Sequence, residues 1–493
     1  MRNSIMYYKS KNDHIRVVVF YSIGNSFEFP GTVFIAENQR VERAGGTNLY
    51  GIAFDMGTTT VEAALVEMES AKICEVQRER GAAKVFGADV MSRLTVALRG
   101  EETRIQIQNT ILTQMDAMIE KLSHDRGIIP EEICRVTLAG NTVMMHLTLG
   151  LSVESLGKAP FASQYKGCKE MTAGNLGLQG LREDTPVLGL PVIKEHVGAD
   201  ALSGMIHLGM DYKKDAILFI DIGTNGEIAL CRDGQAYVCS TAAGPVFEGA
   251  GIRGGRVAGP GVITHVELAD GQIALQTYGT MGAEAVQGIC GSGVMDAMAV
   301  LLEAGLLSTE GMLYSVEELK QRGVDYTLQR HVVSTPEGRE AVLHAANEKI
   351  LAAARGNPAL FLSMRGQDAS YVAIDQKSVR NFQLGKSAIR TGIDILLEIA
   401  DVRPEELDRV YLAGAFGDVL RISSAARLGL WPVIPENCIR PVGNAALKGA
   451  VQALCSEEIR MRSQDLAVRA IHVSLANHPA FESRFIENMN FPA

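Results

Sequence analysis

The sequence predicts an α/β protein built from a duplicated domain, with an insertion in the second half. From Tyr50 onward, apolar strand patterns alternate with long amphipathic helices, which is typical of α/β architecture. The segment PEEICRVTLAG at 130–140 recurs as PEELDRVYLAG at 404–414, with eight of eleven positions identical. Earlier in each half, FDMGTTTVEAAL at 54–65 resembles IDIGTNGEIAL at 220–230. Two matches in the same order indicate an internal duplication.

The spacing of the matched motifs locates the insertion. From Asp55 to Leu138 is 83 residues, whereas from Asp221 to Leu412 is 191, a difference of 108. We therefore expect the following organisation: a short strand-rich segment at 1–48, a first domain at 49–209, a second domain at 210–442 with an insertion subdomain at about 245–370, and a C-terminal connecting helix and tail at 443–493.

Individual elements follow from local patterns. Apolar runs at 16–21 and 32–36, separated by Gly, Asn and Pro, predict two strands in the first segment. Apolar residues at helical spacing predict helices at 104–125 and 385–400.

Composition excludes several classes of protein. A net charge of −10 argues against a generally basic nucleic-acid binder. No two of the eight cysteines are closer than eight residues, so a zinc ribbon or a locally spaced iron–sulfur site is excluded. The N-terminus lacks a signal-peptide pattern, and no apolar stretch approaches a membrane span. We expect reduced thiols, no membrane association and a cytoplasmic location.

The two Asp-x-Gly-Thr turns suit phosphate binding. Glycine lets the backbone approach a ligand, and successive N–H groups and threonine hydroxyls can cradle phosphate oxygens. Asp55 and Asp221, at the strand ends, are placed to hold Mg²⁺ directly or through water. One such turn alone would equally suit an ordinary hairpin, but two copies inside a duplication favour a phosphate clamp. The remaining residues of the two turns are Gly57, Thr58, Thr59 and Thr60, and Gly223, Thr224, Asn225 and Gly226.

Two further glycine turns fit an adenine nucleotide. LAGAFGD at 412–418 follows an apolar strand, and its bare backbone would let a base or ribose lie against it. A second turn, at Gly291 and Ser292, opens a helix whose first N–H groups could meet a phosphate or ribose. The alternative for both is a helix N-terminus packed closely on a sheet. The first turn contributes Gly414, Ala415, Phe416 and Gly417.

These motifs together resemble the superfamily of actin, sugar kinases and heat-shock chaperone ATPases. The resemblance implies two RNase H-like domains that close over Mg²⁺ and ATP. Over roughly 41–492 the sequence is similar, more specifically, to reductive activators of corrinoid proteins. The segments that carry this similarity follow one another in the order YGIAFDMGTTTVEAAL, LAGNTVMMHLTLGL, HVGADALSGMI, FIDIGTNGEIAL, TAAGPVFEGAGIRGG, GICGSGVMDA, LAGAFGDVLRISSAARLGLWP, VGNAALKGA and FIENMNF.

The resemblance implies a function and roles for the motifs. Members of that family use ATP to drive an electron onto a Co(II) corrinoid protein, which restores the Co(I) nucleophile of a methyltransferase. The Asp55 and Asp221 loops then fall on the phosphates and metal, and the 414–417 turn falls on the adenosine. Asp200, on an expected connecting helix at 197–208, or Asn141 could orient the attacking water. The alternatives are a helix N-terminal acid for Asp200 and a helix cap for Asn141.

The glycine-rich segment at 241–261 begins the insertion and contains Glu248, Arg253 and Arg256. Such a segment could contact a protein partner or the nucleotide, or form an ordered surface loop.

The sequence departs from the family pattern in its cysteines. These activators usually begin with a ferredoxin-type domain, whereas the 48 residues before the core contain no cysteine. Cys231 and Cys239 fall on neighbouring predicted strands, but we expect them to be buried and reduced. We expect no iron–sulfur cluster in this chain and an external ferredoxin or flavodoxin as electron donor. A homodimer remains open, as do two other functions: a non-redox, nucleotide-dependent client-binding module and a small-molecule kinase.

Overall fold

The computed structural model describes residues 5–9, 15–19 and 49–492, apart from 160, 195, 224, 280–285, 336, 346–348, 351–352, 354–360, 362, 365–370 and 418. β1 (Ile5–Lys9) and β2 (Ile15–Val19) form an antiparallel pair. The strand predicted at 16–21 overlaps β2, whereas the one predicted at 32–36 lies outside the described residues.

The first half is built on a six-stranded sheet in the order β5-β4-β3-β6-β8-β7. Its three antiparallel strands are followed by two parallel ones, and β7 runs antiparallel at the edge. The strands are β3 (Tyr50–Met56), β4 (Thr60–Glu67), β5 (Lys72–Arg80), β6 (Ile133–Gly140), β7 (Lys169–Thr172) and β8 (Pro186–Gly189). Around them lie η1 (Ala82–Phe86), α1 (Val90–Ala97), α2 (Glu101–His124), η2 (Pro130–Glu132), α3 (Thr142–Thr148), η3 (Glu154–Leu156), α4 (Ala173–Leu176) and α5 (Ala199–His207).

The second half repeats this plan in the order β11-β10-β9-β18-β19, with β20 added beside β11. β9, β10 and β11 are antiparallel, and β18 and β19 continue the sheet in parallel, as β6 and β8 do in the first half. The duplicated, mixed α/β fold is therefore confirmed. The strands are β9 (Ile217–Ile222), β10 (Gly226–Arg232), β11 (Gln235–Thr241), β18 (Arg409–Ala413), β19 (Ile439–Gly443) and β20 (Ile471–His472). Between and after them lie η6 (Pro404–Glu406), α12 (Gly414–Gly417), α13 (Ile422–Arg427), η7 (Glu436–Cys438), α14 (Ala445–Cys455), α15 (Glu457–Arg469), η8 (Leu475–Asn477) and α16 (Phe481–Glu487).

One long helix of each half covers its sheet. α2 buries apolar residues from Ile107 to Leu122 at helical spacing, and Glu101 and Glu102 in its first turn suit the helix dipole. α11 (Gln376–Ile399) starts nine residues before the predicted position, 376 against 385. Its cap is Asp375, which accepts from the Ser378 N–H at 2.7 Å. This start was missed because the cap is also the last residue of a strand.

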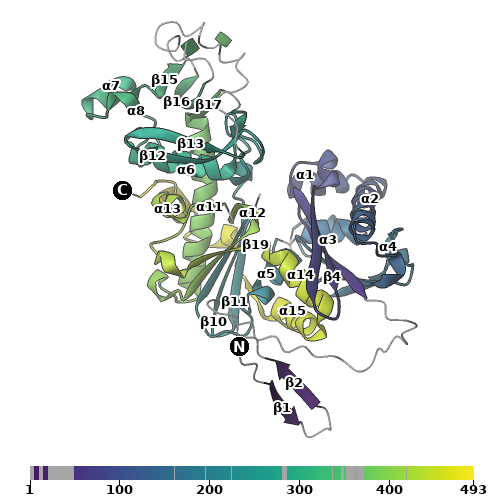
Figure 1. The fold of residues 1–493 in the computed structure, drawn as a ribbon. Helices are drawn as coiled ribbons and strands as arrows, with labels where there is room; N and C mark the ends of the chain where they lie inside the picture. The colour runs from purple at the N-terminus through teal and green to yellow at the C-terminus, as the bar shows by residue number, and fades with distance from the viewer. Residues whose placement is uncertain are drawn as a thin grey trace.

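Helices α5 and α14 each pack on the sheet of the other half. Apolar residues of α5 join the core of the second sheet around Phe219, whereas those of α14 join the core of the first sheet. α5 and α14 cross between the halves, as Figure 1 shows. At the crossing, a Cβ on Gly449 would lie 2.0 Å from the Ser203 carbonyl oxygen, so only glycine fits. The two helices also share a sequence pattern, VGADALSG at 197–204 and VGNAALKG at 442–449.

The described residues between β11 and α11 form the upper lobe in Figure 1. A three-stranded sheet, β13-β12-β14, packs against α6, and a second sheet has the order β15-β16-β17. The described elements of this lobe are η4 (Pro245–Glu248), β12 (Val262–Ala269), β13 (Gln272–Thr277), β14 (Gly288–Ile289), α6 (Gly291–Glu303), α7 (Val316–Gln321), α8 (Tyr326–Gln329), β15 (Val332–Thr335), β16 (Gly338–His344) and β17 (Val372–Asp375).

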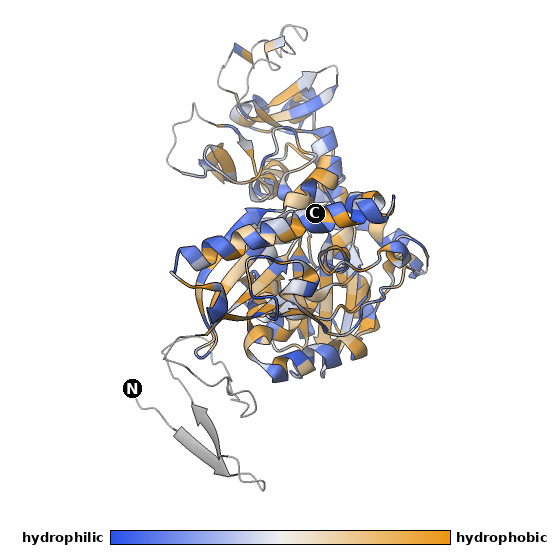
Figure 2. Ribbon diagram, turned by 90° about the vertical axis from the view of Figure 1, so that its right-hand side faces the viewer, coloured by the Kyte–Doolittle hydropathy of each residue, from blue (hydrophilic) through white to orange (hydrophobic). Residues whose placement is uncertain are grey.

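The C-terminal tail is fastened along α11. The Gln383 side chain donates to the Met489 carbonyl at 3.0 Å, and Lys386 donates to the Asn490 carbonyl at 2.6 Å. Phe491 is buried in the core of the second half. Figure 2 shows mainly hydrophobic strands in the sheets and a mixture of both residue types on the outer helices. Among the described residues, no helix is both long and apolar enough to cross a bilayer.

Candidate nucleotide site

Asp55 lies near the end of β3, at the junction of the two halves. It stands opposite Glu62 of β4, and its carboxylate accepts from the Asn444 amide of the second half at 2.8 Å. Burial, followed by the nearby Asp200, raises the pKa of Asp55 well above its ordinary value, against the opposing effect of the Asn444 hydrogen bond.

Asp221 occupies the equivalent position in the second half, near the end of β9. It stands opposite Glu227 of β10, just as Asp55 stands opposite Glu62. Burial and the neighbouring Asp200 raise the pKa of Asp221 to about 7. Burial, Asp200 and Asp221 raise the pKa of Glu227 well above its ordinary value. The pKa of Asp200, in the first turn of α5, is raised to about 6 by burial.

Carboxyl groups from both halves thus meet in a setting that disfavours their ionised forms. A divalent cation would reverse this, because it stabilises carboxylates. Among the described residues, however, no group of three or more His, Cys, Asp or Glu side chains is arranged to hold a metal by itself.

The first phosphate loop is tightly folded. A Cβ on Gly57 would lie 2.3 Å from the Thr60 carbonyl oxygen, so the turn requires glycine. The Thr58 hydroxyl accepts from the Asn141 amide at 2.9 Å. The Thr59 hydroxyl donates to Glu248 of η4, in the second half, at 3.3 Å. Of the predicted threonines, Thr59 therefore lies where the two halves meet.

The second phosphate loop has the same place in its own sheet. The Gly223 N–H donates to the Asn225 carbonyl at 2.9 Å, which closes the turn. Gly226 begins β10 opposite Ile222, and a Cβ there would lie 2.8 Å from the Thr241 hydroxyl. Thr224, also predicted for this loop, lies outside the described residues.

The predicted adenosine turn lies against the second phosphate loop. Gly414 has a φ of 83°, and a Cβ there would lie 2.7 Å from an oxygen of Asp221. A Cβ added to Gly417 would lie 2.9 Å from the Leu412 carbonyl oxygen, so this position is also close-packed. The backbone of Ala415 and Phe416 continues the turn as α12. A strand pairing of Ala413 with Asp221 fixes this arrangement.

Gly291 and Ser292 lie at the buried N-terminus of α6. The Ser292 hydroxyl donates to the Thr264 carbonyl of β12 at 2.9 Å. A Cβ on the following Gly293 would lie 2.6 Å from the Ile263 carbonyl. The start of α6 is therefore packed closely on the sheet, which is the alternative to a ligand-binding turn at this position.

Asp200 and Asn141 are brought together around Gly198. A Cβ on Gly198 would lie 2.4 Å from the Asn141 Cα and 2.7 Å from an Asp200 oxygen. Asn141 also caps α3, because it accepts from the Met144 N–H at 3.0 Å. Asn141 therefore both caps α3 and contacts Thr58 of the predicted phosphate loop.

The sequence did not predict Glu62, Glu227 or Asn444 as residues of the site. It indicated Glu248 only as part of the glycine-rich segment at 241–261. Glu62 and Glu227 lie in the two matched hairpin segments, so the repeat itself carried their signal. Asn444 lies in the third repeat, shared by α5 and α14, which became apparent only with the fold.

The cysteines that fall on neighbouring strands do not face each other. Cys231 is paired with Ala236 and Cys239 with Ile228, and the two thiols lie in cores on opposite faces of the sheet. Both are buried and free, as predicted. Burial raises the pKa of Cys231 to about 12.

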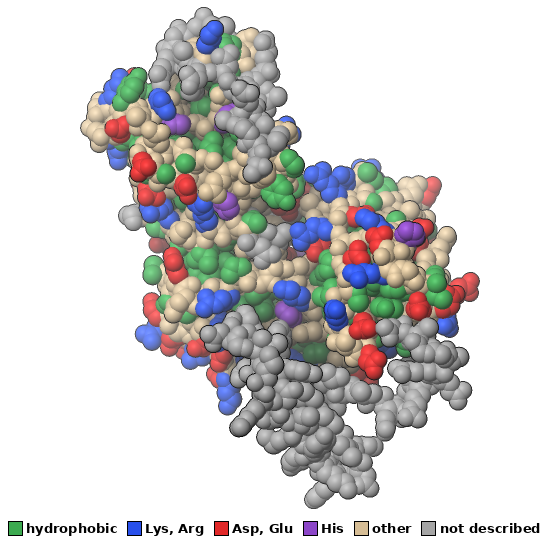
Figure 3. Space-filling view, viewed as in Figure 1, with side chains coloured by type: hydrophobic (Ala, Val, Ile, Leu, Met, Phe, Trp, Pro, Cys, Tyr) green, Lys and Arg blue, Asp and Glu red, His purple; other side chains and the backbone are tan. Residues whose placement is uncertain are grey.

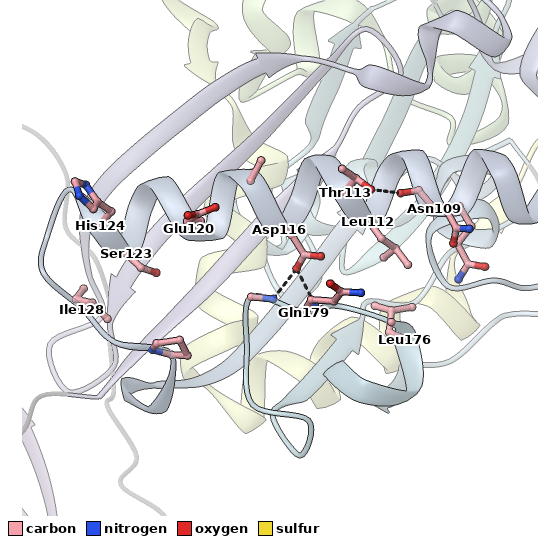
Figure 4. A pocket seen from close by; sticks show the side chains of 15 residues that line it. Asn109, Leu112, Thr113, Asp116, Glu120, Ser123, His124, Ile128, Leu176 and Gln179 are labelled. Carbon is pink, nitrogen blue, oxygen red and sulfur yellow. Dashed lines mark hydrogen bonds between the residues drawn. The ribbon is translucent and has the colours of Figure 1, made fainter.

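A groove on the first half is separate from these loops. It lies between α2 and the loop at 176–180, where Asp116 accepts from the Gln179 and Gly180 N–H groups at 3.0 Å (Figure 4). None of the predicted site residues lines it.

Paired RNase H-like sheets, with an Asp-x-Gly-Thr hairpin on each and a late glycine turn beside one of them, define the actin-like ATPase class of fold. The family model described as the C-terminal domain of RACo, the ASKHA domain, matches residues 215–493. The model of the RACo middle region matches residues 50–213. The chain therefore belongs to the RACo family.

Relatives of known sequence and structure agree. The corrinoid activation enzyme RamQ of Eubacterium limosum is 34% identical, over 90% of this chain and 70% of its own. A Methanosarcina barkeri protein named [Co(II) methylated amine-specific corrinoid protein] reductase is 23% identical, over 90% of this chain and 77% of its own. A solved structure, titled reductive activator for corrinoid, iron-sulfur protein, has a TM-score of 0.76 and 29% identity, and covers 91% of this chain and 67% of its own.

Proposed function

We propose that this chain is an ATP-dependent activator that returns an inactive Co(II) corrinoid protein to the Co(I) state. Its relatives named as corrinoid activation enzyme and Co(II) corrinoid protein reductase support this. The structural observation that carries the ATP part is the contact of Gly414 with Asp221, which joins the adenosine turn to a phosphate loop.

The residues of the cleft have distinct tasks in this proposal. Asp55 and Asp221 hold the hydrated Mg²⁺ of Mg²⁺–ATP, and the Thr58 hydroxyl and the backbone N–H groups of the loop, that of Thr59 included, bind the phosphates. Bound ATP supplies the free energy of its hydrolysis to the otherwise unfavourable electron transfer. Asn444 keeps Asp55 oriented, and α5 and α14 transmit closure between the halves.

The electron comes from a separate ferredoxin or flavodoxin, and it goes to the corrinoid of a methyltransferase system. One electron converts Co(II) to Co(I). We place the reaction in the cytoplasm, which the free cysteines support.

The test is a reconstituted reduction. The protein is mixed with the Co(II) form of a methyltransferase corrinoid protein, Ti(III) citrate and Mg²⁺–ATP under anaerobic conditions. We expect the corrinoid spectrum to shift to that of Co(I) only when protein and ATP are both present. ADP in place of ATP, and the Asp221→Asn variant, serve as controls. Unchanged spectra, with ATP turnover indifferent to the corrinoid protein, would exclude this function.

A further inference from the structure

One hydrogen bond joins the first phosphate loop to the glycine-rich segment of the second half. The Thr59 hydroxyl donates to a carboxylate oxygen of Glu248 at 3.3 Å, although the two residues are 189 positions apart. Figure 3 shows an open notch between the upper lobe of the second half and the first half. The bond therefore links two bodies at their cleft.

Glu248 is held firmly on its own side. It ends η4, where the two preceding side chains, Val246 and Phe247, are buried in the core of the second half. Gly385 of α11 allows this approach, since a Cβ there would lie 2.6 Å from the Ala243 carbonyl. A ring contact between Phe247 and Phe382 of α11, with centroids 5.7 Å apart, anchors the segment further.

Thr59 lies on the other side, in the turn between β3 and β4. Its loop is closed by the Gly81 N–H, which donates to the Thr59 carbonyl at 2.9 Å, and its side chain is half-buried. The hydrogen bond from its hydroxyl to Glu248 connects this loop to the second half. The bond to the anchored carboxylate therefore ties the Thr59 hydroxyl to the second half.

We propose that Glu248 is a positioning residue for ATP hydrolysis, which acts through Thr59 to hold the first phosphate loop against the second half. This rests on the proposed function. In hydrolysis, water forms a bond to the γ-phosphorus, the bond to the β–γ bridging oxygen breaks, ADP leaves with the electron pair and a proton passes to solvent. Glu248 takes no part in these bond changes. It sets the position of the loop, and a small misplacement of such a loop lowers turnover strongly.

The test is a double-mutant cycle in ATP turnover by the full chain. Glu248→Ala removes the acceptor, and Thr59→Val removes the donor. Glu248→Gln keeps an acceptor oxygen without the charge. Glu436→Ala, at an exposed glutamate of another 3₁₀ helix (η7), is the matched control. Thermal unfolding of each variant shows that it is folded, and binding of a fluorescent ADP gives affinity separately from kcat.

We expect Glu248→Ala to lower kcat at least tenfold, with the Kd for ADP changed less than threefold. Glu248→Gln should recover part of the loss, and Glu436→Ala should stay within twofold of the parent. In the Thr59→Val background, Glu248→Ala should have little further effect, because the partner is already lost. Additive losses, or an unchanged kcat in Glu248→Ala, would overturn the proposal while leaving the ATPase intact. A parent protein that neither binds nor hydrolyses ATP would instead overturn the proposed function, and this inference with it.

Discussion

The side-chain amide of Asn444 donates to Asp55 at 2.8 Å, across 389 positions of the chain. The same side chain caps α14, because its oxygen accepts from the Leu447 N–H at 2.7 Å. Asn141 does the equivalent in the first half, where it caps α3 and donates to Thr58. In both cases the residue that caps a helix also donates to a side chain of a predicted phosphate loop.

Replacement of Asn444 should separate these two tasks. Asn444→Ala loses both hydrogen bonds, and we expect a loss of about 1–2 kcal/mol in unfolding free energy. Asn444→Asp keeps a capping oxygen but places a second carboxylate beside Asp55, so its main defect should be weaker Mg²⁺–ADP binding. Denaturant unfolding and calorimetric titration distinguish the two, with the exposed Asn477→Ala as control. Parent-like nucleotide binding by both variants would contradict a role for this contact in the site.

Stability without nucleotide should fall as the pH rises from about 4 to about 7. The pKa of Asp221 is raised to about 7 and that of Asp200 to about 6, so the folded state binds more protons than the unfolded state in this window. The difference between the parent and Asp221→Asn isolates Asp221 from buried His207, whose lowered pKa of about 4 acts in the opposite direction. Melting temperatures at constant ionic strength provide the measurement.

Mg²⁺–ADP should flatten this dependence, because the cation favours the ionised carboxylates. The nucleotide should therefore raise the melting temperature more at pH 8 than at pH 5.5. An equal increase at both values would place the nucleotide away from these carboxyl groups.

Gly414→Ala should damage both the fold and the site. The backbone there has a φ of 83°, and the new methyl group would lie 2.7 Å from an Asp221 oxygen. We expect a loss of about 1–3 kcal/mol in unfolding free energy and at least tenfold weaker ADP binding. Gly167→Ala, where a Cβ meets no atom within 4 Å, is the control. Tight ADP binding by Gly414→Ala would remove this turn from the site.

Gly449→Ala should force α5 and α14 apart. The added methyl group would lie 2.0 Å from the Ser203 carbonyl oxygen, and a backbone atom cannot move away by changing rotamer. Overpacking of this kind costs about 1–3 kcal/mol. Denaturant unfolding measures the loss, against Gly100→Ala, where a Cβ meets nothing within 4 Å. A stability equal to that of the control would mean that the crossing tolerates separation.

The sequence predicted most accurately those features that are determined locally. The repeated Pro-Glu-Glu turn forms a 3₁₀ helix in both halves, and Glu132 and Glu406 each accept from the backbone N–H three residues before them. The strands that follow, β6 and β18, take equivalent places beside β3 and β9. Likewise, the two hairpins place Asp55 and Asp221 correspondingly, because strand, turn and returning strand follow one another directly in the chain, at 50–67 and at 217–232.

The rest depends on contacts between distant segments. Which hairpin residue faces an aspartate is set by strand register, so Glu62 and Glu227 could be assigned only from the paired strands. Asn444 reaches Asp55 because α14 lies on the sheet of the other half, an exchange of helices that no local pattern encodes.

That exchange of helices constrains how the chain can fold during synthesis. The core of the first half includes Leu447, Ala450, Val451, Ala453 and Leu454 of α14. These residues leave the ribosome only after all the strands of the first sheet and the strands from β9 to β19 have been made, so the first sheet must wait with one face incomplete. The two halves cannot mature one after the other as separate domains commonly do. A chain arrested before α14 would expose that face to chaperones.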